Sequence, residues 1–155
     1  MGISIKEKYS LVCYLSLLHC TDQTFIVMAF NGKYELENQD NFGPFMKALG
    51  LSDEMIEKGN DLKSVSEIVQ NGNHFKITVT TGTKVLTNEF IVGQETDVQT
   101  PTGAKMKAII NLEGTNKLVL KAENVTSITE LTGDRLVNTM TIGNIVYTRQ
   151  SKKIC

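Results

Sequence analysis

The chain has 155 residues, of which 41% are hydrophobic and 21% are charged, an ordinary composition for one globular domain with a sizeable core. Its net charge of −1 gives no electrostatic basis for binding nucleic acid, so we expect no nucleic-acid partner. Lysines and arginines are scattered rather than clustered as a polybasic membrane patch, and no apolar run is long enough to span a bilayer.

The first 27 residues differ from the rest, and we expect a poorly ordered extension ahead of a barrel domain at residues 28–155. An apolar segment, Tyr9 to Leu18, weakly resembles a signal peptide. The segment is short, however, and no A-x-A-like cleavage site follows it. We favour an extension from an upstream start codon, with Met28 opening the regular pattern, and a secretory signal stays open as the alternative.

The three cysteines, Cys13, Cys20 and Cys155, all lie near the ends of the chain. Three cysteines in this arrangement do not make a disulfide framework, and their spacing does not match that of a zinc site. The pattern predicts free thiols in a reducing compartment, with neither a metal nor another cofactor.

The first regular pattern is a strand-like alternation from Asn31 to Glu37, after which the hydrophobic period becomes helical. Asn41 is a typical N-cap for the first helix, and Gly50 can end it. Ser52 can cap a second helix, whose early acids suit the helix dipole and which Gly59 would end. Each helix is too short to be stable alone, so the pair is expected to pack on something else.

From residue 64 onward, strand-like runs follow one another with turn signals at short spacing. Asn71-Gly72 is the strongest hairpin signal among them. No segment offers the long crossover that parallel strands need. The pattern therefore predicts a mainly β fold, an antiparallel up-and-down sheet of about ten strands. Closure of this sheet into a barrel would remove its exposed edges.

Arg149 lies on the apolar face of the last expected strand, because side chains alternate and Ile145 and Tyr147 share its side. An arginine cannot shed its charge, and burying it without a partner is costly. Either this strand has no true interior or the interior holds an anion.

Other polar residues share faces that otherwise carry aliphatic side chains, namely Ser66, Thr129, Asn138 and Ser151. A barrel of about eight strands is filled by its side chains or holds one small ligand, so roughly ten strands should leave a larger cavity. Water and a ligand head group in that cavity would satisfy these polar groups. Two alternatives stay open: core polar residues bonded to one another, or strand faces misassigned by one residue.

An enzyme is not favoured, because the chain has only two histidines, His19 and His74, and no readable nucleophile–base pair or phosphate-cradling glycine loop. Glu67 and Glu89 fall on the expected outer faces, which argues against paired-carboxylate chemistry. A lipid-modifying enzyme is therefore the least favoured alternative.

Several segments resemble the intracellular fatty-acid-binding proteins, and those in the middle and at the end resemble the liver-type members. The segments are Met28 to Tyr34, Asn41-Phe42, Phe45 to Leu51, Val65 to Gly72, Asn138 to Thr141 and Tyr147 to Ile154. The resemblance implies a ten-stranded calycin barrel, similar to lipocalins, with a two-helix lid between the first and second strands. It also implies a non-enzymatic carrier that binds long-chain fatty acids reversibly in the cytoplasm.

Many members of that family hold the ligand carboxylate with two arginines and a tyrosine in an Arg-x-Tyr ending. In this chain the ending is Arg149-Gln150-Ser151, and Thr129 matches the other arginine. This departure is the liver-type pattern, which goes with a roomier cavity and broader ligands. The resemblance places Arg149, Ser66 and Ser151 around the carboxylate, with Asn138 nearby.

The resemblance further implies a second, shallower ligand near the lid, with its head group toward Lys58 and Thr83. The expected ligands include other hydrophobic anions, such as acyl-CoA, bile salts and lysolipids. We expect a monomer that makes transient membrane contact through the helical lid, with a nuclear location left open. A secreted lipocalin-like carrier stays the alternative if residues 1–27 are a signal peptide.

Overall fold

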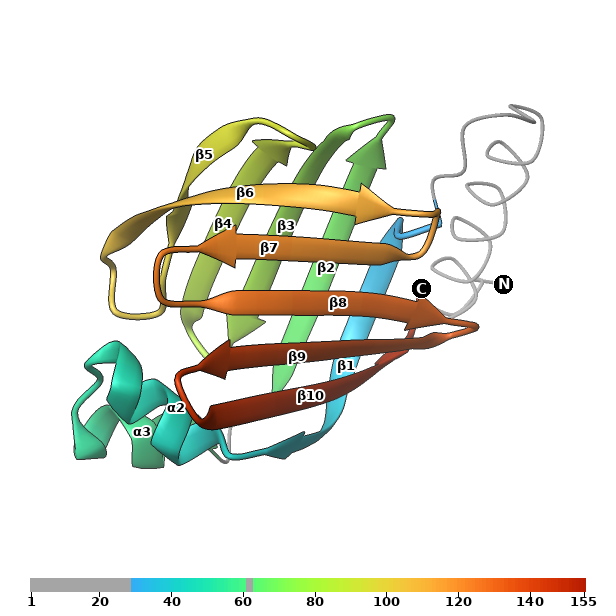
Figure 1. Cartoon of the computed structure of the whole chain (residues 1–155). Coiled ribbons are helices and arrows are strands. Elements are labelled where there is room, and N and C mark those ends of the chain that lie inside the picture. The colour runs from blue at the N-terminus through green and yellow to red at the C-terminus, as the bar shows by residue number, and fades with distance from the viewer. Residues whose placement is uncertain (1–28, 61–62) are drawn as a thin grey trace, which may run out of the picture.

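The computed structural model describes residues 29–60 and 63–155. Within these ranges ten strands form one antiparallel sheet that curls into a barrel (Figure 1). The strands are β1 (Gly32–Asp40), β2 (Ser64–Asn71), β3 (His74–Thr81), β4 (Lys84–Ile91), β5 (Glu95–Gln99), β6 (Lys105–Glu113), β7 (Lys117–Ala122), β8 (Thr126–Thr132), β9 (Arg135–Ile142) and β10 (Ile145–Lys153). Two helices, α2 (Phe42–Leu49) and α3 (Asp53–Asn60), lie between β1 and β2. The predicted fold class is therefore confirmed, whereas the predicted extension, Cys13 and Cys20 lie outside the described residues.

Consecutive strands pair with one another, and β1 also pairs with β10, but the backbone ladder is interrupted between β4 and β5. The side chain of Asn88 on β4 bridges this gap to Gln99 on β5. Asn88 Nδ2 donates to the Gln99 carbonyl at 3.1 Å, and Asn88 Oδ1 accepts from the Gln99 amide at 2.7 Å. Closure of the sheet is thus completed at this point by a side-chain amide instead of a strand ladder.

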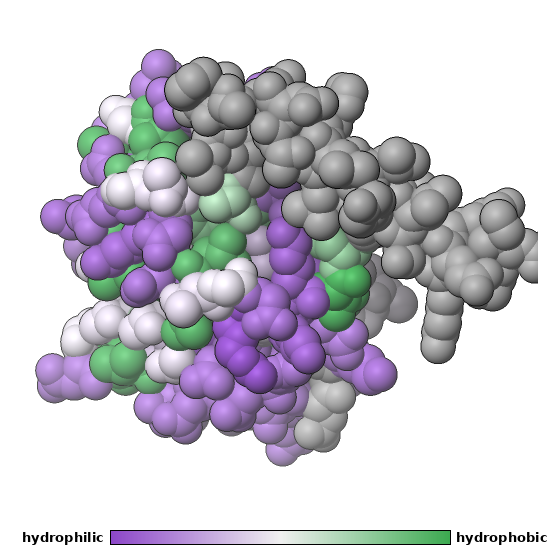
Figure 2. Space-filling view, turned by 90° about the vertical axis from the view of Figure 1, so that its right-hand side faces the viewer, coloured by the Kyte–Doolittle hydropathy of each residue, from purple (hydrophilic) through white to green (hydrophobic). Residues whose placement is uncertain are grey.

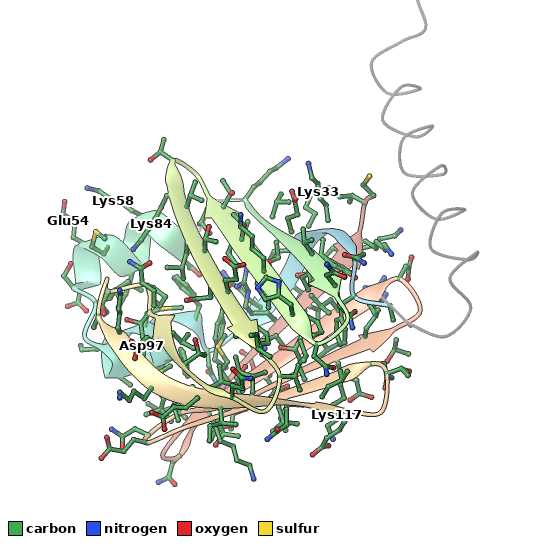
Figure 3. The ribbon with its side chains drawn as sticks, turned by 90° about the horizontal axis from the view of Figure 1, so that it is seen from above. Lys33, Glu54, Lys58, Lys84, Asp97 and Lys117 are labelled. Atoms are coloured by element: carbon green, nitrogen blue, oxygen red, sulfur yellow. The ribbon has the colours of Figure 1, made fainter. Side chains whose placement is uncertain are left out.

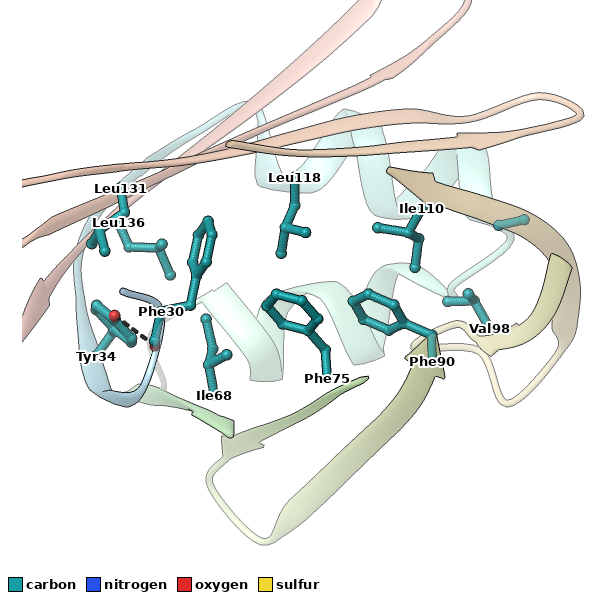
Figure 4. Close-up of a cluster of buried hydrophobic side chains, with 11 residues drawn as sticks. Phe30, Tyr34, Ile68, Phe75, Phe90, Val98, Ile110, Leu118, Leu131 and Leu136 are labelled. Carbon is teal, nitrogen blue, oxygen red and sulfur yellow. Dashed lines mark hydrogen bonds between the residues drawn. The ribbon is translucent and has the colours of Figure 1, made fainter. Parts of the chain in front are cut away.

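Two apolar clusters fill the ends of the barrel. The larger one is built around stacked rings: Phe75 lies 5.3 Å from Phe90 between ring centroids, and Phe30 meets Phe75 edge-on at 5.8 Å (Figure 4). The smaller one lies beneath the helices and contains Phe45, Met46, Val125 and Tyr147. By contrast, the outer face shown in Figure 2 is mainly hydrophilic, with hydrophobic residues in small separate patches.

The first helix is fixed to the barrel by aromatic packing. Phe45 stacks on Tyr147 of β10 with centroids 5.2 Å apart, and Phe42 lies 5.9 Å from the same ring. Asn41 stands at the N-cap position, but its side chain donates to the Val146 carbonyl at 2.9 Å instead of capping the helix as predicted. The side chain therefore ties the start of α2 to β10.

The remaining helix boundaries follow the predicted signals closely. Gly50 ends α2 in the left-handed region at φ 101°, where its amide donates to helix carbonyls. Ser52 Oγ accepts a hydrogen bond from the Met55 amide at 3.3 Å, as expected of a cap. Gly59 was expected to end α3, but the helix continues through Asn60. Neither these helices nor any other in the described ranges combines the length and apolar character needed to cross a membrane.

The C-terminus follows the barrel edge beside β1. Lys33 donates its amide to the Cys155 carbonyl at 3.1 Å, and the Ile154 amide donates to the Lys33 carbonyl at 2.8 Å. Cys155 is disulfide-bonded, so the prediction of a free thiol is wrong at this position.

Alkaline stability should depend on Tyr34, whose fully buried hydroxyl donates to the Phe30 carbonyl at 2.8 Å. Burial raises the pKa of Tyr34 from 10.0 to about 12. The unfolded chain therefore loses this proton first as the pH rises, and the free energy of unfolding falls across that interval. We expect Tyr34→Phe to cost about 1 kcal/mol near neutral pH and to flatten the alkaline decline.

Urea unfolding of the parent and of Tyr34→Phe at a series of pH values checks this expectation. An equally steep alkaline decline in the variant would contradict the assignment of the decline to Tyr34.

Candidate functional site

A band of polar side chains crosses the inner face of the barrel between the two apolar clusters. Backbone register puts Gln39 of β1 opposite Arg149 of β10, Arg149 opposite Asn138 of β9, and Asn138 opposite Thr129 of β8. Because Leu136 and Met140 flank Asn138 on the same face of β9, the band has apolar neighbours on both sides.

Asn138 and Thr129, both predicted site residues, lie together and bond to each other. Asn138 Nδ2 donates to Thr129 Oγ1 at 2.7 Å and to Ser127 Oγ at 3.0 Å. The amide is thereby held in one orientation beside Arg149. Part of the band is therefore a network of mutually bonded polar side chains.

Arg149 is the only group in this part of the band that carries a fixed charge, and its bonding is incomplete within the described residues. Its Nη2 donates to Ser64 Oγ at 2.9 Å, which makes the guanidinium reach across β1 to β2. Its Nε is buried and has no hydrogen-bond partner among the described residues. A buried donor of a charged group without an acceptor is costly, so this N–H is suited to an anionic oxygen.

Ser66 and Ser151 also lie on the inner face, where they are 9% and 5% exposed. Ser66 stands opposite Tyr34 of β1, and Ser151 stands opposite Leu136 of β9. Among the described residues, the hydrogen bond of Arg149 goes to Ser64 and not to either of these serines. The fold thus brings the three predicted residues onto one surface, with no hydrogen bond between them among the described residues.

Tyr147 connects the polar band to the helices. Its hydroxyl donates to Gln39 Oε1 at 2.6 Å, while its ring lies under Phe45. Burial raises the pKa of Tyr147, and the positive charge of Arg149 lowers it by a smaller amount. The phenol therefore responds to the charge at Arg149.

A pocket of about 440 Å³ opens at the helix end of the barrel. Its lining comes from the α2–α3 connection and from the β3–β4 and β5–β6 turns, and consists of residues 50–52, 55, 84–86 and 99–103. Lys58 and Thr83, predicted for a second ligand, are exposed near this end but do not line the pocket. Lys58 instead pairs with Glu54 at 2.9 Å, and Figure 3 shows both near Lys84.

Sequence reasoning missed three residues of the site: Gln39, Ser64 and Thr81, whose hydroxyl donates to Ser64 Oγ at 3.1 Å. Ser64 is in phase with Ser66 and was therefore detectable by alternation. A β-bulge between Leu36 and Asn38 turns Gln39 inward, which simple alternation would not reveal.

A ten-stranded up-and-down barrel with a helical pair at one end and a half-buried arginine on its inner face is the architecture of a protein that encloses a small ligand. Comparisons with known proteins agree with this class. The sequence profile of the lipocalin / cytosolic fatty-acid binding protein family matches residues 28–155.

Two relatives show how far the similarity extends. The liver fatty acid-binding protein of Sus scrofa is 55% identical over 127 residues, which is 82% of this chain and 100% of the relative. The liver fatty acid-binding protein 1 of Ambystoma mexicanum is 58% identical over 126 residues, which is 81% of this chain and 100% of the relative.

Solved structures agree as well. A zebrafish ileal bile acid-binding protein complexed with cholic acid superposes with a TM-score of 0.70 and 44% identity, covering 81% of this chain and 99% of that chain. The chain belongs to the lipocalin / cytosolic fatty-acid binding protein family. The relatives from Sus scrofa and Ambystoma mexicanum are liver fatty acid-binding proteins.

Replacing Arg149 should change the titration of Tyr147. In a background in which Tyr9, Tyr14 and Tyr34 are replaced by phenylalanine, we expect Arg149→Met to raise the pKa of Tyr147 further, because the nearby positive charge no longer stabilises the phenolate. Ultraviolet absorbance of tyrosinate during alkaline titration measures this change.

Arg135→Met is the matched control, since Arg135 is exposed and pairs with Glu37 at 2.8 Å on the outer surface. A lowered or unaltered Tyr147 pKa in Arg149→Met would show that the two groups do not interact.

Proposed function

We propose that this chain is a non-enzymatic carrier that reversibly binds long-chain fatty acids inside its barrel. The observation that carries the proposal is Arg149, a half-buried arginine whose buried Nε lacks an acceptor among the described residues. A carboxylate supplies two acceptor oxygens and pairs well with the arginine fork. The names of the relatives, which are fatty acid-binding proteins, support the same ligand class.

The apolar wall supplies most of the affinity in this proposal. A tail of about sixteen carbons buries about fifteen methylene or methyl groups at roughly 0.8 kcal/mol each, or about 12 kcal/mol before costs. Ordering the ligand subtracts several kcal/mol, and a charge-assisted head-group bond adds roughly 1.5–3 kcal/mol. Arg149 therefore sets orientation and the preference for anions more than total affinity.

The ligand carboxylate lies at Arg149 in this proposal, with Ser66 of β2 and Ser151 of β10 as hydroxyl partners. Asn138 and Thr129 hold the adjacent wall in place through their mutual hydrogen bond. Because Ser151 and Thr129 are small, the site also accepts bulkier hydrophobic anions, such as bile salts, acyl-CoA and lysolipids. The related zebrafish protein complexed with cholic acid supports this breadth.

The entrance, in our proposal, is the pocket between the helices and the β3–β4 and β5–β6 turns. A second, shallower ligand would place its head group there, toward Lys58 and Thr83. Met55 and Val85 line this pocket and are 47% and 60% exposed, so the helical lid presents apolar tips for brief contact with a membrane.

We propose that the protein is a cytoplasmic monomer. The matched family, which includes the cytosolic fatty-acid binding proteins, supports the location. The nuclear location and the role of residues 1–27 as an extension stay predictions from the sequence. The comparisons favour neither the secreted carrier nor the lipid-modifying enzyme.

The decisive experiment compares an acid with an alcohol of the same tail. We expect Arg149→Met to weaken oleate binding roughly 10- to 100-fold, because a charge-assisted bond of about 1.5–3 kcal/mol is lost. Binding of oleyl alcohol should change little. Isothermal titration calorimetry of both ligands measures the two affinities.

Arg135→Met again serves as the control, because it removes an arginine from the outer surface alone. If Arg149→Met kept the oleate affinity and the acid preference of the parent, the head group would lie elsewhere.

Ligand exchange tests the entrance. We expect a short crosslink between Met55→Cys and Val85→Cys to slow ligand release, because both residues line the same pocket at the mouth. Stopped-flow transfer of a fluorescent fatty acid to an acceptor measures the rate.

The matched control joins Val69→Cys to Lys76→Cys, which are register partners on the outer face of β2 and β3. Equal exchange rates in the two crosslinked proteins would place the entrance away from this pocket.

A further inference from the structure

We propose that Ser64 is a specificity-determining residue of the anion site, whose hydroxyl donates to the ligand carboxylate together with Arg149. The inference deepens the proposed function and rests on it. Neither the predicted site nor the comparisons point to Ser64, and its case rests on its hydrogen bonds, its burial and its place beside Arg149.

The hydrogen bonds of Ser64 leave its proton available. Ser64 Oγ accepts from Arg149 Nη2 at 2.9 Å and from Thr81 Oγ1 at 3.1 Å. A hydroxyl has two acceptor positions and one donor. Both acceptor positions are therefore in use, while no described residue accepts the Ser64 proton.

The unused donors lie on two groups that are bonded to each other. Arg149 Nε has no partner within the described ranges, and the Ser64 hydroxyl is joined to the same guanidinium through Nη2. The two oxygens of one carboxylate can therefore accept hydrogen bonds from the Arg149 Nε–H of β10 and from the Ser64 hydroxyl of β2. An alcohol or an ester head group cannot use both donors as strongly, because it carries no negative charge.

Burial increases the strength of this arrangement. Ser64 is 3% exposed, and Arg149 Nε is shielded from solvent. Hydrogen bonds to a charge are stronger where water is excluded. Donation by Arg149 and Thr81 to the same oxygen also polarises the Ser64 hydroxyl and makes it a better donor.

Thr81 is the positioning residue for this hydroxyl. It is the register partner of Ser64 and the last residue of β3, immediately before the turn that leads to Lys84 and Val85 at the pocket. Its hydrogen bond restricts rotation of the Ser64 side chain, so that the hydroxyl oxygen stays within reach of Arg149 Nη2.

The test measures acid-over-alcohol preference, the ratio of the affinities for oleate and oleyl alcohol, by calorimetry. We expect Ser64→Ala to lower this ratio about tenfold, and Ser64→Thr, which keeps a hydroxyl, to retain most of it. Thr81→Val should lower the ratio by a smaller factor. Thr78→Val, on the outer face of β3, is the matched control and should leave it unchanged.

Three results would overturn the assignment of Ser64. If Ser64→Ala weakened the binding of oleate and of oleyl alcohol equally, Ser64 would have a structural role only. If it changed neither affinity, Ser64 would not contact the ligand. If it made oleate bind more tightly, Ser64 would compete with the ligand for Arg149. If Ser64→Ala does not fold by circular dichroism, Thr81→Val decides by the same ratio. If the parent protein did not prefer oleate over oleyl alcohol, both the proposed function and this inference would be overturned. If only Ser64→Ala left the ratio unchanged, this inference would be overturned and the proposed function would stand.

Discussion

The structure depends on keeping one permanently charged guanidinium inside an apolar barrel. Arg149 cannot neutralise itself, so the surrounding strands must supply acceptors or leave a donor for a ligand. They do both, because Ser64 accepts from Nη2 while Nε stays unpaired among the described residues. This incomplete pairing is the reason for proposing a binding site here instead of a filled core, and for proposing that the ligand is anionic.

The polar band and the two apolar clusters divide the interior by function. The aromatic cluster around Phe75 and Phe90 is closely packed and stabilises the end away from the helices. The cluster under the helices joins Phe45 to Tyr147, and Tyr147 bonds to Gln39, the register partner of Arg149. The Tyr147 side chain therefore contacts both the helices and the polar band. It connects the proposed entrance to the proposed head-group position.

Much of this arrangement follows from local sequence signals. Alternation assigned Arg149, Ser66, Asn138 and Ser151 to the inner face, and glycine turns with helical spacing located the elements. The differences arise where a nonlocal contact decides. Asn41 binds the Val146 carbonyl, which only the folded barrel brings near, so its side chain does not cap α2. Gln39 turns inward because of a bulge, and bulges leave no simple sequence period. The hydrogen bond between Arg149 and Ser64 crosses an intervening strand, β1. Neither residue propensity nor the hydrophobic pattern predicts a contact between side chains on strands that are not adjacent.

The interruption between β4 and β5 has a mechanical consequence. A ring of strands joined everywhere by backbone hydrogen bonds can change its circumference only by breaking or shifting a whole ladder. Here the seam is bridged by the two hydrogen bonds of Asn88 to Gln99 and by the Lys84 ammonium, which donates to the Pro101 carbonyl. All three bonds are made by side chains that can rotate. The wall can therefore widen along one line at small cost while the other strand pairs stay in register. In a carrier whose ligands differ in width, this seam would be the place where the wall adjusts.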